Sequence, residues 1–257
     1  MANGLAVITG ASTGIGRELA RIAAREGYDL VLVADEPQID VAAGELRSEG
    51  VAVEAVEADL ATFEGNDRML AAVAGRPVDI LIANAGRGLG HAFVEQSPEE
   101  WRRVIDTNVT GTTYLLQKTA QIMVRQGSGR ILITGSIAGL IPGSYQAVYN
   151  GTKAYLDSFA YALREELADT GVGVTVLMPG PTDTQFFARA NMLDTPVGQD
   201  DSKEDPVKTA ENGWKAMMDG SAHVVSGVKN KIQAALSHLT PDTMLAKQHT
   251  KMAKPDA

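Results

Sequence analysis

Tyr149 and Lys153 are the two residues of this sequence whose types and spacing most directly suggest chemistry. Residues four positions apart lie on the same face of a helix, one turn from each other. A phenol has a reference pKa near ~10, and a neighbouring ammonium group favours the phenolate form. Tyr149 can therefore exchange a proton with a substrate oxygen, and Lys153 can relay that proton or hold a nearby hydroxyl group.

The intervening Asn150-Gly151 pair conflicts with a helix at first sight, because Asn-Gly is typical of a tight β-turn. No alternating strand pattern flanks the pair, however, and apolar residues recur at helical spacing after it, at Tyr155 and Phe159. We therefore predict a helix over 145–169, although a helical glycine costs about 1 kcal/mol relative to alanine. The expected reason for so small a residue is that a bound molecule and a neighbouring helix leave little space.

Ser136 and Asn108 are two further polar candidates. Ser136 directly follows the apolar run 130–135, where its hydroxyl can steady charge that develops on a substrate oxygen. Asn108 lies within a long helical pattern, 97–126, where an amide is a weak helix former, and it can hold a water molecule on a proton path from Lys153. Each has a plainer interpretation, since a serine after a strand often forms a turn and a mid-helix asparagine can mark a bend.

These residues must be positioned by a repeating pattern of strands and helices. Seven apolar runs are predicted as strands, at 5–9, 30–34, 51–56, 78–83, 130–135, 172–178 and 223–227. Helical patterns lie between them at 15–26, 38–49, 63–74, 97–126 and 145–169, with a further helix after Asp205. Such an alternation indicates an α/β fold with a doubly wound parallel sheet covered on both faces. We predict one domain over 1–257, with a mobile substrate loop at 185–205 and a helical C-terminal extension at 228–257.

The first strand run ends in a glycine cluster, TGASTGIG (9–16), which also opens the first helix. Glycines let a ligand approach the backbone closely, and the free N–H groups and dipole of a helix N-terminus favour an anion. A simple tight turn is the alternative for an isolated pair of glycines. Three glycines between a strand and a helix favour the phosphates of a dinucleotide instead.

The glycine spacing resembles the TGxxxGxG motif of the short-chain dehydrogenases/reductases. Three further segments are similar to this family: Asp59-Leu60, ANAG (83–86, with Ala83 in place of the first Asn of NNAG) and PGPTDT (179–184). Four residues match the family's catalytic positions one for one: Asn108, Ser136, Tyr149 and Lys153. The resemblance covers roughly residues 3 to 190, and together these motifs are highly specific.

This resemblance implies a three-layer Rossmann-type fold and an NAD(P)-dependent oxidoreductase that transfers a hydride between nicotinamide and an alcohol or carbonyl substrate. The four matching residues would be catalytic, with Tyr149 as the general acid/base. The implied cofactor-binding residues are Gly10, Ser12, Thr13, Gly14, Ile15, Gly16, Asp35, Asp59, Leu60, Asn84, Ala85, Gly86, Tyr149, Lys153, Pro179, Gly180, Thr182 and Thr184. Of these, Asp59 would contact the adenine ring and Thr184 the nicotinamide carboxamide.

The choice between NAD and NADP depends on the end of the second strand, which holds the ribose 2′-hydroxyl or 2′-phosphate in such folds. Here the sequence reads VADEP (33–37), and the carboxylate of Asp35 accepts a hydrogen bond from a hydroxyl but repels a phosphate. No Arg or Lys occurs between Arg25 and Arg47, so Arg17 is the candidate partner for a phosphate. NAD is therefore predicted over NADP. The alternative is that the acid is merely solvated.

The residues expected to face the substrate are mainly apolar, which suits a hydrophobic alcohol, ketone or aldehyde. They are Ser136, Ile137, Leu140, Ile141, Tyr145, Gln146, Tyr149, Phe186, Phe187 and Met192. The alternative is that the apolar members simply pack together beneath a closed loop. The expected assembly is a homo-oligomer, a dimer or tetramer formed through the helices at 97–126 and 145–169.

Composition argues against several other classes of function. A formal charge of −9 disfavours nucleic acid, which requires clustered Lys and Arg. With no cysteine there is no disulfide or thiolate nucleophile. The four histidines (His91, His223, His238 and His249) show no metal-ligand spacing, so no metal is expected. The absence of a signal-peptide pattern and of a membrane-length apolar run predicts a cytoplasmic protein with no membrane partner.

Two other functions remain open on this scaffold. One is an epimerase or lyase that keeps nicotinamide bound, and the other is a non-catalytic nucleotide-sensing protein. Epimerases and lyases of this fold are usually longer and have a different glycine spacing. Sensing proteins typically lose the Tyr or the Lys, whereas this chain has both Tyr149 and Lys153.

Overall fold

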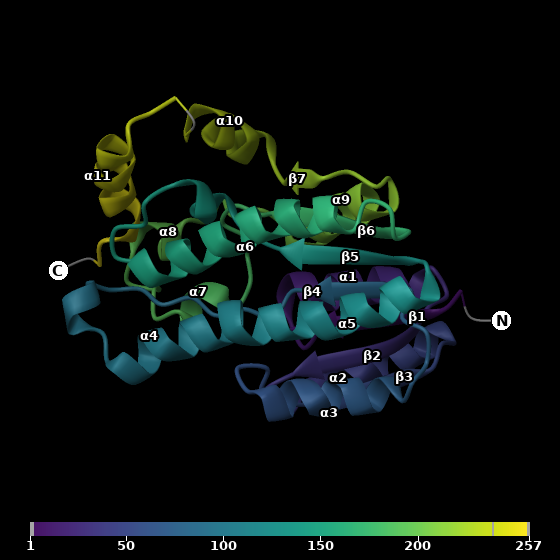
Figure 1. The fold of residues 1–257 in the computed structure, drawn as a ribbon. Helices are drawn as coiled ribbons and strands as arrows, with labels where there is room; N and C mark the ends of the chain where they lie inside the picture. The colour runs from purple at the N-terminus through teal and green to yellow at the C-terminus, as the bar shows by residue number, and fades with distance from the viewer. Residues whose placement is uncertain (1–2, 238, 256–257) are drawn as a thin grey trace.

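The structure, a computed structural model, describes residues 3–237 and 239–255. In these residues seven parallel strands form one sheet in the order β3-β2-β1-β4-β5-β6-β7, and helices cover both of its faces (Figure 1). The strands are β1 (Leu5–Thr9), β2 (Asp29–Ala34), β3 (Val53–Glu57), β4 (Ile80–Ala83), β5 (Gly129–Thr134), β6 (Val172–Met178) and β7 (His223–Val225). This arrangement confirms the predicted three-layer, Rossmann-type fold.

Two sets of helices bury the two faces of the sheet. One face is covered by α1 (Gly14–Arg25), α2 (Gln38–Leu46) and α9 (Pro206–Met218). The other is covered by α3 (Phe63–Val73), α5 (Thr112–Gln126) and α6 (Ala147–Glu166). Within β1, Val7 packs into one core and Ile8 into the other, and both are fully buried. The five inner strands therefore read as nearly continuous apolar runs, because neither face of the sheet meets water there, whereas the edge strands β3 and β7 are partly exposed.

The predicted long helix at 97–126 is interrupted in the structure. Asp106–Gly111 form a π-helical turn between α4 (Pro98–Ile105) and α5. A β-carbon on Gly111 would lie 1.7 Å from the carbonyl oxygen of Leu60, so this turn approaches the loop after β3 more closely than any side chain allows. Such wide turns are frequent at functional sites, and this one carries Asn108.

The predicted helix over 145–169 is α6, which begins at Ala147 because Tyr145 has a left-handed backbone with φ of 65°. A neighbouring helix does not explain Gly151, since a β-carbon there would meet no atom of the described residues within 4 Å. The crowded residue is its neighbour Asn150, which is buried and donates its side-chain amide to two backbone carbonyls. The part of the Gly151 prediction which concerns a bound molecule stays a prediction.

The predicted loop at 185–205 contains two short helices, α7 (Phe186–Arg189) and α8 (Pro196–Gln199). Its polar sequence conceals three buried apolar residues, Phe187, Ala190 and Met192. They pack together against Ala253 from the end of the chain, a contact that no local pattern could reveal. The mobility of this segment stays a prediction.

The predicted C-terminal extension at 228–257 forms two helices in the described residues, α10 (Val228–Ser237) and α11 (Asp242–Ala253). In Figure 1, α10 follows β7, and the chain then turns so that α11 lies beside α8. The extension thus returns to the segment that follows β6. Residues 238, 256 and 257 lie outside the described residues.

Candidate active site

The glycine cluster forms the turn between β1 and α1. Gly10 and Gly14 have positive φ values of 63° and 57°, which favour glycine. A β-carbon on Gly16 would lie 2.2 Å from the carbonyl oxygen of Gly10, so only glycine lets the helix start pack against the turn. The N-cap residue Thr13 makes no side-chain cap, and the first turn of α1 holds no acid. Uncapped N–H groups at a helix start that holds no acid of its own fit the diphosphate of a dinucleotide. Within the turn, Ser12 Oγ donates a 2.5 Å hydrogen bond to the carboxylate of Glu36.

Tyr149 and Ser136 meet at the carboxyl end of β5. Ser136 follows that strand directly, and Tyr149 lies in the first turn of α6. Both side chains are buried. Ser136 Oγ donates to the carbonyl oxygen of Pro179 at 3.3 Å and accepts from the backbone N–H of Ala138 at 3.1 Å. Burial raises the pKa of Tyr149 well above its usual value, and the neighbouring Ser136 side chain acts in the opposite direction. The pair places two hydroxyl groups where one substrate oxygen can reach both.

The prediction that Lys153 lowers the pKa of Tyr149 is wrong for the protein without a bound cofactor, in which that pKa is raised. The Nζ atom of Lys153 lies 5.9 Å from the centre of the Tyr149 ring and donates a 2.7 Å hydrogen bond to the carbonyl oxygen of Thr134. Burial also lowers the pKa of Lys153 to about 8, against the opposing charge of Asp157. A buried ammonium group that is hydrogen-bonded elsewhere does not offset the burial of the phenol. Tyr149 therefore carries its proton at neutral pH.

Asp157 is a buried acid beneath this pair that the sequence reasoning missed. It lies four residues after Lys153 on α6, and its Oδ1 accepts a hydrogen bond from the backbone N–H of Ser136 at 3.3 Å. Glycines make room for it, because β-carbons on Gly135 and Gly139 would lie 1.8 and 2.2 Å from its oxygens. Burial raises the pKa of Asp157 to about 7, opposed by the charge of Lys153. The signal that would have found Asp157 is the four-residue spacing, because it follows Lys153 by four residues just as Lys153 follows Tyr149.

Asn108 ties two parts of the site together through its amide. Its Nδ2 donates to the carbonyl oxygen of Arg87 at 2.8 Å and to Oγ1 of Thr152 at 2.9 Å. Its Oδ1 accepts from the backbone N–H of Arg87 at 2.8 Å. The loop after β4 is thereby fixed against α6. The predicted water site at Asn108 stays a prediction.

A cavity of about 280 Å³ runs along the carboxyl ends of the strands and brings most of the predicted residues together. The predicted cofactor residues that line it are Gly10, Ser12, Thr13, Gly14, Ile15, Asp35, Asp59, Leu60, Asn84, Ala85, Gly86, Tyr149, Lys153, Pro179, Gly180, Thr182 and Thr184. The predicted substrate residues that line it are Ser136, Ile137, Ile141, Gln146, Tyr149, Phe186 and Phe187.

Five predicted residues do not line this cavity. Gly16 packs behind the glycine turn, and Asn108 is covered by its own hydrogen bonds. Leu140 packs against the core of the sheet. Tyr145 and Met192 pack into the apolar cluster around Phe187, so their side chains support the wall rather than form it.

The cavity also has lining residues that no local pattern marks. Arg87 comes from the loop after β4 and Arg189 from α7. Four others come from the C-terminal extension: Gln233, His249, Met252 and Ala253. They enter the site only because the chain folds back over it.

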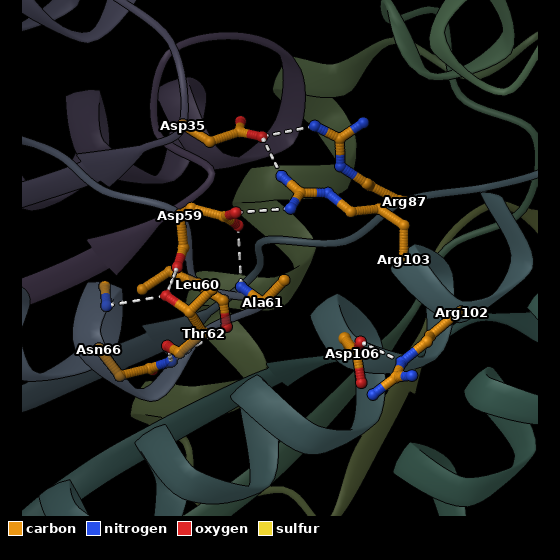
Figure 2. A network of polar contacts seen from close by, with 11 residues as sticks. Asp35, Asp59, Leu60, Ala61, Thr62, Asn66, Arg87, Arg102, Arg103 and Asp106 are labelled. Carbon is orange, nitrogen blue, oxygen red and sulfur yellow. Dashed lines mark hydrogen bonds and ion pairs between the residues drawn. The ribbon is translucent and has the colours of Figure 1, made fainter. Parts of the chain in front are cut away.

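Asp35 and Asp59 also line the cavity, and each of them contacts an arginine (Figure 2). Asp35 Oδ2 is 2.5 Å from a guanidinium nitrogen of Arg87 and 3.7 Å from one of Arg103. Asp59 Oδ2 is 2.5 Å from another nitrogen of Arg103, and its Oδ1 accepts from the backbone N–H of Ala61 at 3.0 Å. Two cations therefore balance the two acids.

Arg17, the predicted phosphate partner, pairs instead with Glu45. The cations near Asp35 are Arg87 and Arg103, which are distant from it in sequence and adjacent to it only in the fold. Asp35 therefore has two cationic neighbours in the fold, although the sequence around it contains no Arg or Lys.

Comparison with known proteins shows the family to which this arrangement belongs. Residues 4–193 match the family model of the short chain dehydrogenases. The chain is a member of the short-chain dehydrogenase family. An uncharacterised oxidoreductase of Staphylococcus epidermidis is 36% identical to it over 183 residues, which are 70% of this chain and 78% of that protein.

Two solved structures of short-chain dehydrogenases resemble this one closely. The enzyme of Sphingobium yanoikuyae in complex with NADPH has a TM-score of 0.82 and 30% identity, over 99% of this chain and 98% of its own. The enzyme of Burkholderia phymatum in complex with NAD has a TM-score of 0.85 and 25% identity, over 93% of this chain and 94% of its own. Both nicotinamide cofactors thus occur among its structural relatives.

Neither a membrane-spanning helix nor a metal-binding cluster is found in the part of the chain that the structure describes. Within residues 3–237 and 239–255, no helix is long and apolar enough to cross a membrane. In the same part of the chain, no group of three or more His, Asp or Glu side chains could hold a metal ion. His238 lies outside it.

Proposed function

We propose that this short-chain dehydrogenase is an NAD(P)-dependent oxidoreductase that interconverts an alcohol and a carbonyl compound, with Tyr149 as the general acid/base. The observation that carries this proposal is the single cavity that is lined both by Tyr149 and Ser136 and by the glycine turn after β1. A nicotinamide cofactor whose diphosphate was bound at that turn would supply or accept the hydride. The side chains of the protein then have to bind the substrate oxygen and move its proton.

The residues around Tyr149 divide this work. Because burial keeps its phenol protonated, Tyr149 can donate that proton to a carbonyl oxygen as the carbonyl is reduced. Ser136 donates a second hydrogen bond to the same oxygen and stabilises its developing charge. Lys153 Nζ lies 3.6 Å from where a β-carbon of Gly86 would be, next to the loop after β4. From there it can hold the ribose hydroxyls and return a proton toward Tyr149.

The substrate is proposed to be an apolar ketone, aldehyde or alcohol. Near Tyr149 the cavity is lined by Ile137, Ile141, Phe186 and Phe187. The ring centres of Tyr149 and Phe186 are 5.2 Å apart, so an aromatic wall stands directly beside the reacting oxygen. An apolar wall favours a substrate whose carbonyl is its main polar group.

NAD is proposed as the preferred cofactor, with NADP as a weaker alternative. Asp35 directly follows β2 and lines the cavity, which supports its predicted hydrogen bond to a ribose hydroxyl. Its contacts with Arg87 and Arg103 reduce its repulsion of a 2′-phosphate. We therefore expect a smaller preference for NAD than an unpaired aspartate would produce.

A panel of reactions tests both proposals. NADH and NADPH oxidation is measured with acetophenone, cyclohexanone and octanal, and NAD and NADP reduction with the corresponding alcohols. We expect stoichiometric cofactor turnover with at least one pair and a lower KM for NAD(H) than for NADP(H). A lower KM for NADPH would contradict the cofactor preference. An isomerised substrate without net cofactor turnover would favour an epimerase or lyase, and tight cofactor binding without any reaction would favour a sensing protein.

Asp157→Asn is expected to move the alkaline limb of the pH profile for carbonyl reduction to lower pH. The charge of Asp157 raises the pKa of Lys153 against the effect of burial, so its removal lowers that pKa below about 8. Lys153 then loses its proton at a lower pH, while Asn keeps an oxygen for the backbone N–H of Ser136. The measurement is kcat/KM between pH 6 and 10.

The matched control for this variant is Glu166→Gln, which neutralises an exposed acid at the end of the same helix. Its profile should coincide with that of the unmodified protein. A profile of Asp157→Asn that also coincides with it would contradict the proposed effect of the Asp157 charge on the pKa of Lys153. The predicted homo-oligomer through α4, α5 and α6 and the predicted cytoplasmic location stay predictions.

A further inference from the structure

The C-terminal helix α11 is attached to the site rather than to the sheet. One of its faces, formed by Leu245, His249 and Ala253 at four-residue spacing, is buried. Ala253 is fully buried and packs with Phe187, Ala190 and Met192. The helix therefore packs against the segment that follows β6, and it lies beside α8 of that segment in Figure 1.

Polar contacts fix α11 to the start of α6. Ser144 Oγ donates to the carbonyl oxygen of Ala246 at 2.9 Å, and His249 Nδ1 donates to the carbonyl oxygen of Ser144 at 2.8 Å. Ser144 is followed by Tyr145, whose backbone is left-handed. Helix α6 begins at Ala147 and carries Tyr149 in its first turn. The position of α11 is thus coupled to the helix that carries the proposed acid.

Residues of α11 line the same cavity as Tyr149. They are His249, Met252 and Ala253, and Gln233 of α10 lies with them. Met252 is half-buried, and its flexible thioether side chain fills irregular space. Burial lowers the pKa of His249 below its usual value, so the helix adds no positive charge to this wall at neutral pH. Gln146 also lines the cavity, and its side-chain amide donates a hydrogen bond to the sulfur of Met192 at 3.0 Å.

We propose that α11 is the outer wall of the substrate cavity and that Met252 limits the size of the apolar ketone that fits beside Tyr149. This inference rests on the proposed function, because it assigns a size limit to the substrate of that same site. Its physical basis is that residues of α11 line the same cavity as Tyr149. The side chain at position 252 is the part of the wall that can change in volume without loss of the buried face or of the contacts with Ser144.

The test compares Met252→Ala and Met252→Phe in the full-length protein. Substrates are 2-butanone, acetophenone, propiophenone and benzophenone, with NADH. Met252→Ala should raise kcat/KM for the bulkiest ketone relative to 2-butanone by roughly tenfold or more, since single methylenes in apolar pockets have effects of that order. Met252→Phe should shift the same ratio in the opposite direction. Cofactor dissociation constants should not change.

Met244 provides a matched control on the same helix, because its side chain is 59% exposed and does not line the cavity. Met244→Ala and Met244→Phe should leave every ratio unchanged, and Met252→Leu, which conserves volume, should retain the original ratio. Equal ratios in all Met252 variants, or the same shift in the Met244 variants, would overturn the inference.

If the proposed ketone reduction is wrong, the unmodified protein will reduce none of these ketones, which differs from the results that would overturn the role of Met252. The thermal shift of the protein–NADH complex by the same four ketones then tests the wall independently of turnover. Met252→Ala should extend the range of ketones that stabilise the complex, and Met252→Phe should narrow it. Identical shifts for the three proteins would overturn the inference by this second readout.

Discussion

Tyr149→Phe lowers kcat for carbonyl reduction by roughly 10²–10⁴-fold, the contribution expected of one general acid, and leaves the cofactor dissociation constant unchanged. Only the hydroxyl is removed, and the ring keeps its packing against Phe186. The loss falls on kcat because the proton is transferred as the carbonyl is reduced, whereas the glycine turn binds the cofactor without this hydroxyl. Steady-state kinetics and fluorescence titration with NADH separate the two quantities.

Tyr155→Phe is the control for this variant. It lies on the same helix, is 38% exposed, and its hydroxyl contacts Thr113 at 3.0 Å, outside the cavity. Its kcat should match that of the unmodified protein. If Tyr149→Phe retained more than a tenth of the original kcat, Tyr149 would not be the acid and the proposed mechanism would fail.

Lys153→Met should reduce kcat/KM by roughly 10²-fold or more and also weaken cofactor binding, which distinguishes it from Tyr149→Phe. The variant loses the hydrogen bond from Nζ to Thr134 and the cation beside the Gly86 loop. It also leaves Asp157 without the charge that lowers its pKa, so this pKa rises further and the acid takes up a proton. Titration with NADH and initial rates measure the two losses.

Lys153→Arg should not restore activity, because a guanidinium group is planar, stays charged and does not replace a compact ammonium group. Lys118→Met is the control, since Lys118 is half-buried on α5, does not line the cavity, and its Nζ lies 5.2 Å from the centre of the Tyr114 ring. Full cofactor affinity in Lys153→Met would contradict the assignment of Lys153 to the ribose. Full turnover would contradict its part in the proton path.

The fold and the centre of the site could be predicted because their signals are local. Buried strands between helices appear in the sequence as apolar runs. The glycine turn appears as a fixed spacing of glycines within residues 9–16. Tyr149 and Lys153 are one helical turn apart, so their shared face follows from helix geometry alone. The cavity contains both of them together with Ser136, as their order along the chain predicts.

Electrostatic properties of the site were not predictable in the same way. Whether a buried phenol gains or loses its proton depends on how much water remains near it, and that depends on every element packed around it. The pKa of Tyr149 is raised by burial, although its helical neighbour is a lysine. Likewise, Asp35 appears isolated in the sequence but contacts Arg87 and Arg103 in the fold.

The sequence by itself determined the parallel sheet, the glycine turn and the tyrosine–lysine pair of this short-chain dehydrogenase, because each depends on the chemistry of residues close together in the chain. Only the tertiary structure decided that Asp157 is buried beside Lys153, that two arginines contact Asp35, and that residues of α11 line the cavity. Those contacts join segments far apart in sequence, and the free energy that selects them comes from packing the whole chain at once.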